Sequence, residues 1–143
     1  MVYEELKKFK NKYPFTVAWR LKAHAKVIEK HLDKNEKIGF AFAAQKTDSS
    51  FDFISTYAIV FTNKRLILGQ KRLLFGYMFN SITPDMFNDL SVQMGILWGK
   101  INIDTVKEYV CISSIQKEAL DKIETYATEY LIREKKKYRN NQN

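Results

Sequence analysis

The sequence of 143 residues offers little for cross-linking or metal binding. Cys111 is the single cysteine, so no disulfide can form within the chain, and no Cys or His spacing typical of a zinc site is present. Two prolines and five glycines are too few for a linker-rich or disordered chain. We therefore expect one folded domain that is stabilised by its own hydrophobic core and holds no metal and no cofactor.

Long apolar runs are also missing. No stretch approaches the roughly 20 apolar residues that a membrane-spanning helix requires. The first residues, MVYEELKKFK, lack the apolar segment of a signal peptide and carry Glu4 and Glu5. We expect a soluble, cytoplasmic protein, with peripheral attachment to a membrane as the alternative location.

Motifs of catalytic sites are absent as well. The sequence has no Gly-rich phosphate loop, no H-E-x-x-H and no G-x-S-x-G. His24 and His31 lie on one predicted helix, about 10.5 Å apart along its axis, which is too far to share a metal without further ligands. We expect a protein without enzymatic activity.

Basic residues exceed acidic ones, and the formal net charge is +8. Residues 1–34 hold nine Lys and Arg against four Asp and Glu, residues 35–112 hold eight against seven, and residues 113–143 hold seven against five. The excess therefore lies at the two ends of the chain. A basic chain suggests a nucleic-acid partner, but neither a helix-turn-helix nor an aromatic and basic platform is evident, so we do not expect one.

Apolar residues at helical spacing predict two helices before residue 34. The first contains Leu6 and Phe9 and ends before Pro14, because the residue preceding a proline is disfavoured in a helix. Thr16 is a candidate N-cap of the second helix. The apolar stripe of this helix comprises Val17, Leu21, His24, Ile28 and Leu32.

The middle of the chain changes to an alternating pattern that predicts strands. The predicted strands cover residues 38–43, 53–62, 65–69, 74–79, 90–94, 101–103 and 109–112. Asn63 and Lys64 suit a two-residue hairpin turn between the second and third strands. Short connections between successive strands indicate antiparallel pairing throughout.

A final amphipathic helix follows the strands. Ser113 and Gln116 form a candidate capping box at its start, and the helix is expected to fray from Arg133. Its apolar stripe comprises Ile115, Ala119, Ile123, Tyr126 and Tyr130. We predict an α+β, mainly β, fold in which a rolled antiparallel sheet of seven strands is capped by this helix.

This order of elements resembles the pleckstrin homology (PH) fold, and more specifically the YokE-like group of bacterial PH-like domains. The resemblance rests on Thr62-Asn63-Lys64-Arg65-Leu66-Ile67, on Trp98-Gly99-Lys100-Ile101-Asn102-Ile103 and on the final helix, and it covers about residues 36–132. The predicted organisation is a helical extension over residues 1–33, a PH-like domain over 34–137 and a frayed tail over 138–143.

The resemblance implies a module that works by contact. PH-like folds bind lipids, peptides or proteins, and some relatives assemble through a sheet edge. Our first hypothesis is therefore a protein-interaction or assembly module, binding a partner or itself through a sheet edge and the helical extension. The alternative is a peripheral binder of anionic membrane lipids through the basic ends. The loop at residues 45–52 holds one Lys against two Asp, which argues against phosphoinositide recognition there.

Several basic residues are candidates for contact with an anion or a partner. They are Lys64, Arg65, Lys71, Arg72, Lys22, Lys26 and Lys30. The competing interpretation is that the paired basic residues only keep hairpin turns in water and that the N-terminal stripe packs on the sheet. Leu73, Leu74 and Phe75 form a contact patch if they are exposed together, and part of the core if one side faces inward.

Overall fold

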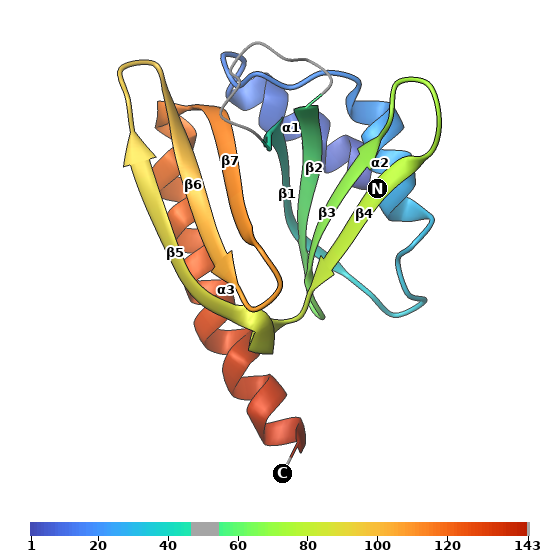
Figure 1. The fold of residues 1–143 in the computed structure, drawn as a ribbon, viewed down its shortest axis with the longest axis vertical. Helices are drawn as coiled ribbons and strands as arrows, with labels where there is room; N and C mark the ends of the chain where they lie inside the picture. The colour runs from blue at the N-terminus through green and yellow to red at the C-terminus, as the bar shows by residue number, and fades with distance from the viewer. Residues whose placement is uncertain (47–54, 143) are drawn as a thin grey trace.

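The computed structural model describes residues 1–46 and 55–142, and its centre is a seven-stranded antiparallel sheet bent into a half-barrel (Figure 1). The strands are β1 Ile38–Gln45, β2 Thr56–Thr62, β3 Leu66–Lys71, β4 Tyr77–Ile82, β5 Phe87–Met94, β6 Trp98–Thr105 and β7 Tyr109–Gln116. Their order is β4-β3-β2-β1-β7-β6-β5, and a short 3-10 helix, η2 (Pro84–Met86), joins β4 to β5. The predicted fold class is confirmed.

Alternation along β1 to β3 gives the sheet two different apolar faces. Large side chains, such as Phe42 and Phe61, point into the core that the final helix covers. Small ones, such as Ala41, Ala43 and Ala58, point to the opposite face, where the N-terminal helices pack. β1–β3 are therefore buried on both faces of the sheet. The small side chains of the second face allow the N-terminal helices to pack closely against it.

The N-terminal extension packs on the sheet of its own chain. α1 (Val2–Lys12) lies over β1, and α2 (Leu21–Glu29) lies over β3. Val2, Leu6 and Ile28 are completely buried in this contact. The apolar stripe of the extension is therefore used within the chain, as the packing interpretation of the sequence predicted.

The start of α2 differs from the prediction. The helix begins at Leu21, and Thr16 is not its N-cap. The segment before it runs beside β7 instead: the Val17 amide donates to the Ser114 carbonyl at 2.9 Å, and the Gln116 amide donates to the Thr16 hydroxyl at 2.9 Å. These long-range bonds occupy the groups that a helix start would have used.

Gly69 determines how closely α2 approaches β3. A Cβ atom at this position would lie 2.5 Å from Cγ1 of Ile28, so any larger residue would displace the helix. Because Gly69 has no side chain, α2 packs in direct contact with the backbone of β3.

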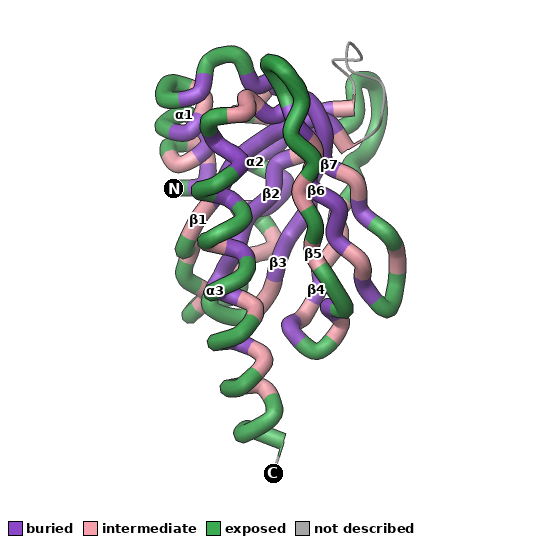
Figure 2. Tube along the Cα trace, turned by 90° about the vertical axis from the view of Figure 1, so that its left-hand side faces the viewer, coloured by how far each residue is buried: buried purple, intermediate pink, exposed green. Residues whose placement is uncertain are grey.

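The final helix, α3 (Lys117–Gln142), begins three residues later than a helix capped by Ser113 would. Ser113 and Gln116 belong to β7, which pairs with β6 up to Trp98, so the predicted capping box is wrong. The helix also continues through Arg133 to Gln142, where fraying was predicted, and its last turns extend beyond the sheet as a largely exposed rod (Figure 2). No helix in the described parts of the chain is long and apolar enough to cross a membrane.

Two further predictions concern the loops. β4 begins at Tyr77, so Leu74 and Phe75 belong to the β3–β4 connection and not to a strand. Most of the loop at residues 45–52 and the first residues of the strand predicted at 53–62 lie outside the described residues.

Candidate functional site

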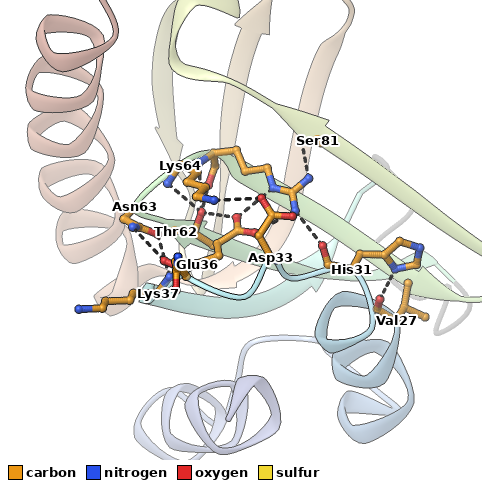
Figure 3. Close-up of polar contacts among 11 residues, drawn as sticks. Val27, His31, Asp33, Glu36, Lys37, Thr62, Asn63, Lys64 and Ser81 are labelled. Carbon is orange, nitrogen blue, oxygen red and sulfur yellow. Dashed lines mark hydrogen bonds and ion pairs between the residues drawn. The ribbon is translucent and has the colours of Figure 1, made fainter. Parts of the chain in front are cut away.

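The turn between β2 and β3 is held by its own side chains. The Thr62 hydroxyl accepts hydrogen bonds from the amides of Lys64 and Arg65 at 3.1 and 3.0 Å. The Asn63 side chain accepts a bond from the Lys37 amide at 2.7 Å, and the Asn63 amide donates to the Lys37 carbonyl at 3.0 Å. The polar residues of this turn therefore have structural roles (Figure 3).

Arg65 turns inward from this loop. Its Nε and Nη2 donate to the two carboxylate oxygens of Glu36, each at 2.9 Å, and Nη2 also donates to the His31 carbonyl at 2.8 Å. Nη1 donates to the Ser81 hydroxyl at 3.2 Å, and the guanidinium lies 5.6 Å from the centre of the Phe79 ring. Few of its donors remain for an external anion.

Glu36 is the anion that Arg65 binds. Its side chain is fully buried, and burial alone would raise its pKa; hydrogen bonds from Arg65 and Thr62 outweigh this effect and lower the pKa from its ordinary value of 4.5 to about 2. The carboxylate therefore stays charged and joins the segment before β1 to the start of β3.

A cleft lies at the other end of β3, between α2 and the β3–β4 hairpin. Its volume is about 700 Å³. The residues that give it a basic rim are Arg20, Lys22, Lys26, Lys30, His31 and Lys71. The residues that form its apolar and aromatic walls are Tyr3, Leu21, Ala23, Val27 and Tyr77. We call this site the basic cleft.

The positive charge of the basic cleft is not neutralised within the described parts of the chain. None of the described residues that line it is acidic. The salt bridges of residues 1–46 and 55–142 do not include Lys22, Lys26, Lys30 or Lys71. The first three of these recur every four residues, so they follow one side of α2 at intervals of about 6 Å.

His24 connects α2 to the end of β3. Its Nδ1 accepts a hydrogen bond from the Lys71 amide at 2.9 Å, and the Lys71 carbonyl accepts one from Arg20 Nη1 at 3.1 Å. Burial, together with the charge of Arg20, lowers the pKa of His24 to about 4. The imidazole is therefore neutral at physiological pH, as an acceptor at Nδ1 requires, and α2 and the hairpin are held together.

The β3–β4 hairpin ends in three exposed apolar residues, which we call the apolar tip. Leu73, Leu74 and Phe75 are 54%, 80% and 84% exposed. The Arg72 amide donates to the Gly76 carbonyl at 3.1 Å, and Gly76 has a φ of 72°, a left-handed conformation that favours glycine. The two possibilities that the sequence left open are thus resolved: these side chains form an exposed patch.

The seven candidate residues occupy three places. Lys22, Lys26, Lys30 and Lys71 meet at the basic cleft, and Arg72 lies at the apolar tip. Lys64 pairs with Asp33 at the surface, with Nζ 3.1 Å from Oδ2, and Arg65 is engaged internally. The sequence interpretation missed Arg20, Tyr3 and Tyr77, since no local signal places them opposite the lysines.

A metal centre is not found in the described part of the chain, where no group of three or more His, Cys, Asp or Glu side chains could hold an ion. His31 instead stacks on Phe79, with ring centres 4.3 Å apart, and its Nε2 lies 3.3 Å from the Tyr77 hydroxyl.

Comparison with known proteins identifies the family. A family model for the bacterial PH domain matches residues 32–129, more than half of the chain. The chain belongs to the bacterial PH domain family. Domains of this kind are generally non-catalytic and mediate protein or lipid interactions. The assignment to the YokE-like group stays a prediction.

Two solved structures are similar to this bacterial PH domain. One is a pleckstrin homology domain from Shewanella amazonensis SB2B, with 16% identity, a TM-score of 0.49, and coverage of 89% of this chain and 88% of that chain. The other is a DUF1696 family protein with a pleckstrin-homology domain from Shewanella loihica PV-4, with 16% identity, a TM-score of 0.48, and coverage of 75% and 92%. No curated protein matches the chain.

The first prediction concerns the paired basic residues of the β2–β3 turn. We expect Arg65→Ala to lower the free energy of unfolding by about 3–5 kcal/mol, because it leaves the buried Glu36 carboxylate without its partner. Lys64→Ala, which removes only a surface pair, should cost about 1 kcal/mol or less. Urea denaturation measures both, and equal losses would contradict the internal role of Arg65.

The second prediction is a dependence of stability on pH. The folded pKa of Glu36 is about 2, below its ordinary value of 4.5. The unfolded chain therefore binds a proton at Glu36 that the folded chain does not, and the free energy of unfolding falls as the pH decreases through this window. Glu36→Gln should have a smaller slope between pH 4.5 and 2 in urea denaturation. Identical slopes in the two proteins would show that Glu36 does not titrate as described.

Proposed function

We propose that this bacterial PH domain attaches to anionic membrane surfaces through the apolar tip and the basic residues beside it. The single observation that carries the proposal is the exposure of Leu73, Leu74 and Phe75 directly after Lys71 and Arg72. Apolar side chains that enter a bilayer, flanked by cations that contact its headgroups, are the two components of interfacial attachment.

The magnitudes support a combined mode of binding. Full burial of a Leu or Phe side chain contributes about 1.5–3 kcal/mol, and a basic residue near an anionic surface contributes about 1 kcal/mol. The apolar tip has three such side chains, and Lys22, Lys26 and Lys30 add charge on the adjacent helix. If fully buried, the three apolar side chains contribute about 4.5–9 kcal/mol at most, and the basic residues add about 1 kcal/mol each, so the two components together are sufficient for reversible attachment.

The rigidity of the hairpin base favours this mode. The backbone of Lys71 is bonded to both Arg20 and His24, so the apolar tip and the basic side of α2 keep a fixed relation. Figure 1 shows the β3–β4 loop at the same end of the molecule as the start of α2. One membrane surface can therefore contact both at once.

The third prediction is tested by vesicle flotation. We expect the wild-type protein to float with vesicles that contain phosphatidylglycerol, to float less as the salt concentration rises, and not to float with pure phosphatidylcholine. Leu74→Ser combined with Phe75→Ser should abolish flotation, because the apolar contribution is lost while the charge is unchanged.

A matched charge control separates local from general electrostatics. The triple variant Lys22→Gln, Lys26→Gln and Lys30→Gln should float much less than the triple variant Lys135→Gln, Lys136→Gln and Lys137→Gln, which has the same net charge. Equal flotation of these two variants, or flotation of the tip variant at the wild-type level, would refute the proposal.

Self-association through β5 is a second candidate function. It is favoured by a difference between the two edge strands of the sheet, β4 and β5. β4 is contacted by the β6–β7 connection: the Asn80 side-chain amide donates to the Glu108 carboxylate, and Lys107 Nζ donates to the Ser81 carbonyl at 3.5 Å. β5 is the last strand at the other edge, and no strand of residues 1–46 or 55–142 pairs with its outer side. An unpaired edge can add a strand from a second copy.

The fourth prediction uses lysines on this edge. If β5 pairs between two copies, sedimentation equilibrium shows a dimer for the wild-type protein. Ser91→Lys with Gln93→Lys should dissociate it, because charges on an edge strand oppose pairing. Thr125→Lys with Thr128→Lys adds the same charge on α3 and should leave the dimer intact. A monomeric wild-type protein at high concentration would exclude this candidate.

A further inference from the structure

The walls of the basic cleft are suited to an aliphatic group. Leu21, Ala23 and Val27 of α2 supply aliphatic surface, and the rings of Tyr3 and Tyr77 line the same cleft. A volume of about 700 Å³ is large enough for a small molecule rather than a single ion. A simple inorganic anion would leave these apolar walls in contact with water.

The rim of the basic cleft is suited to an anionic group. Lys22, Lys26 and Lys30 project from α2, and Lys71 approaches from the end of β3. Their ammonium groups have no ion-pair partner among the described residues. Lysine ammonium groups bind phosphate as point charges, so several of them can share one phosphate without a strict geometry.

The position of the basic cleft relates it to the apolar tip. Lys71 and Tyr77 are paired across the base of the hairpin whose end is the apolar tip. The α2 side of the basic cleft lies outside residues 32–129, the part of the chain that matches the family, whereas Lys71 and Tyr77 lie inside it. The site is therefore formed jointly by the N-terminal extension and the PH domain.

We propose that the basic cleft binds one molecule of a phosphate-bearing amphiphile, with the phosphate among the lysines of the rim and the alkyl chain on the walls of α2. This inference rests on the proposed membrane attachment and names the ligand class that the same surface takes. The phosphate group and the alkyl chain are both required, because each contacts a different part of the site.

The fifth prediction is a direct binding measurement with a monomeric probe. We expect isothermal titration calorimetry to detect binding of dodecyl phosphate below its critical micelle concentration. Inorganic phosphate, which lacks the chain, and dodecyl maltoside, which lacks the charge, should each bind at least about tenfold more weakly. Adenosine monophosphate tests a planar base as the apolar group. Equal or tighter binding of any of these three ligands would overturn the proposal.

Two independent sets of variants locate the site. Ala23→Trp places a large ring in the basic cleft and should abolish binding of dodecyl phosphate, provided that circular dichroism shows a folded protein. Lys22→Gln with Lys26→Gln changes only exposed side chains and should weaken binding by about tenfold or more, while Lys34→Gln with Lys117→Gln should not. Unchanged affinity in the Lys22 and Lys26 variant would overturn the proposal even if Ala23→Trp fails to fold.

The same variants separate this inference from the proposed function. Leu74→Ser with Phe75→Ser should lose flotation with phosphatidylglycerol vesicles but keep its affinity for dodecyl phosphate. Ala23→Trp should show the reverse, since the apolar tip and the lysines remain available to a membrane. Flotation of the wild-type protein without any binding of dodecyl phosphate would refute the basic cleft as an amphiphile site and leave membrane attachment in place.

Discussion

The close packing of the N-terminal helices on a face of small side chains is the constraint on which the rest of the molecule depends. Ala41, Ala43, Ala58 and Gly69 leave room on β1–β3, and Ile28 fills the space above Gly69. Because this contact uses the apolar side of α2, the lysines of that helix remain on its outer side, next to the end of β3. The basic cleft is thus a consequence of packing and not an addition to the fold.

Two pairs of basic residues with similar sequences have different roles in the β2–β3 and β3–β4 hairpins. Arg65 is drawn inward because Glu36 and Thr62 form an anionic, hydrogen-bonded site for it beneath the turn. Lys71 and Arg72 precede a loop with three exposed apolar side chains, and the described residues pair neither of them with an acid. Whether a basic residue in a hairpin has a structural role or is available for binding depends on whether an acidic partner lies next to it in space. The neighbouring residues in the sequence do not reveal this.

The sequence predicted the parts of the fold that depend on local periodicity. The seven strands, the apolar stripe of α1 and the stripe of α3 from Ala119 onward follow from alternating and helical spacing, whereas Ile115, predicted to open the α3 stripe, lies in β7. The PH-like order of elements follows from the succession of these segments. Two of the errors lie where a local signal competes with a distant partner. Thr16 has the side chain of an N-cap, but its hydroxyl accepts a bond from the Gln116 amide, exactly one hundred residues further along the chain. Ser113 remains in β7 because that strand continues to pair with β6.

The basic cleft lay beyond sequence-based prediction for the same reason, since Lys22 and Lys71 come together only through the docking of α2 on β3. The apolar tip differs from the basic cleft, because its residues are adjacent in the sequence. The sequence left undecided only whether they are exposed or buried. Its turn requires the Arg72–Gly76 bond and a glycine at the left-handed position, and nothing in that geometry requires apolar side chains at Leu73, Leu74 and Phe75. Their hydrophobic surface contributes no stability to the isolated fold while it faces water. It contributes free energy only when another apolar surface covers it, and the neighbouring lysines favour a surface that is also anionic.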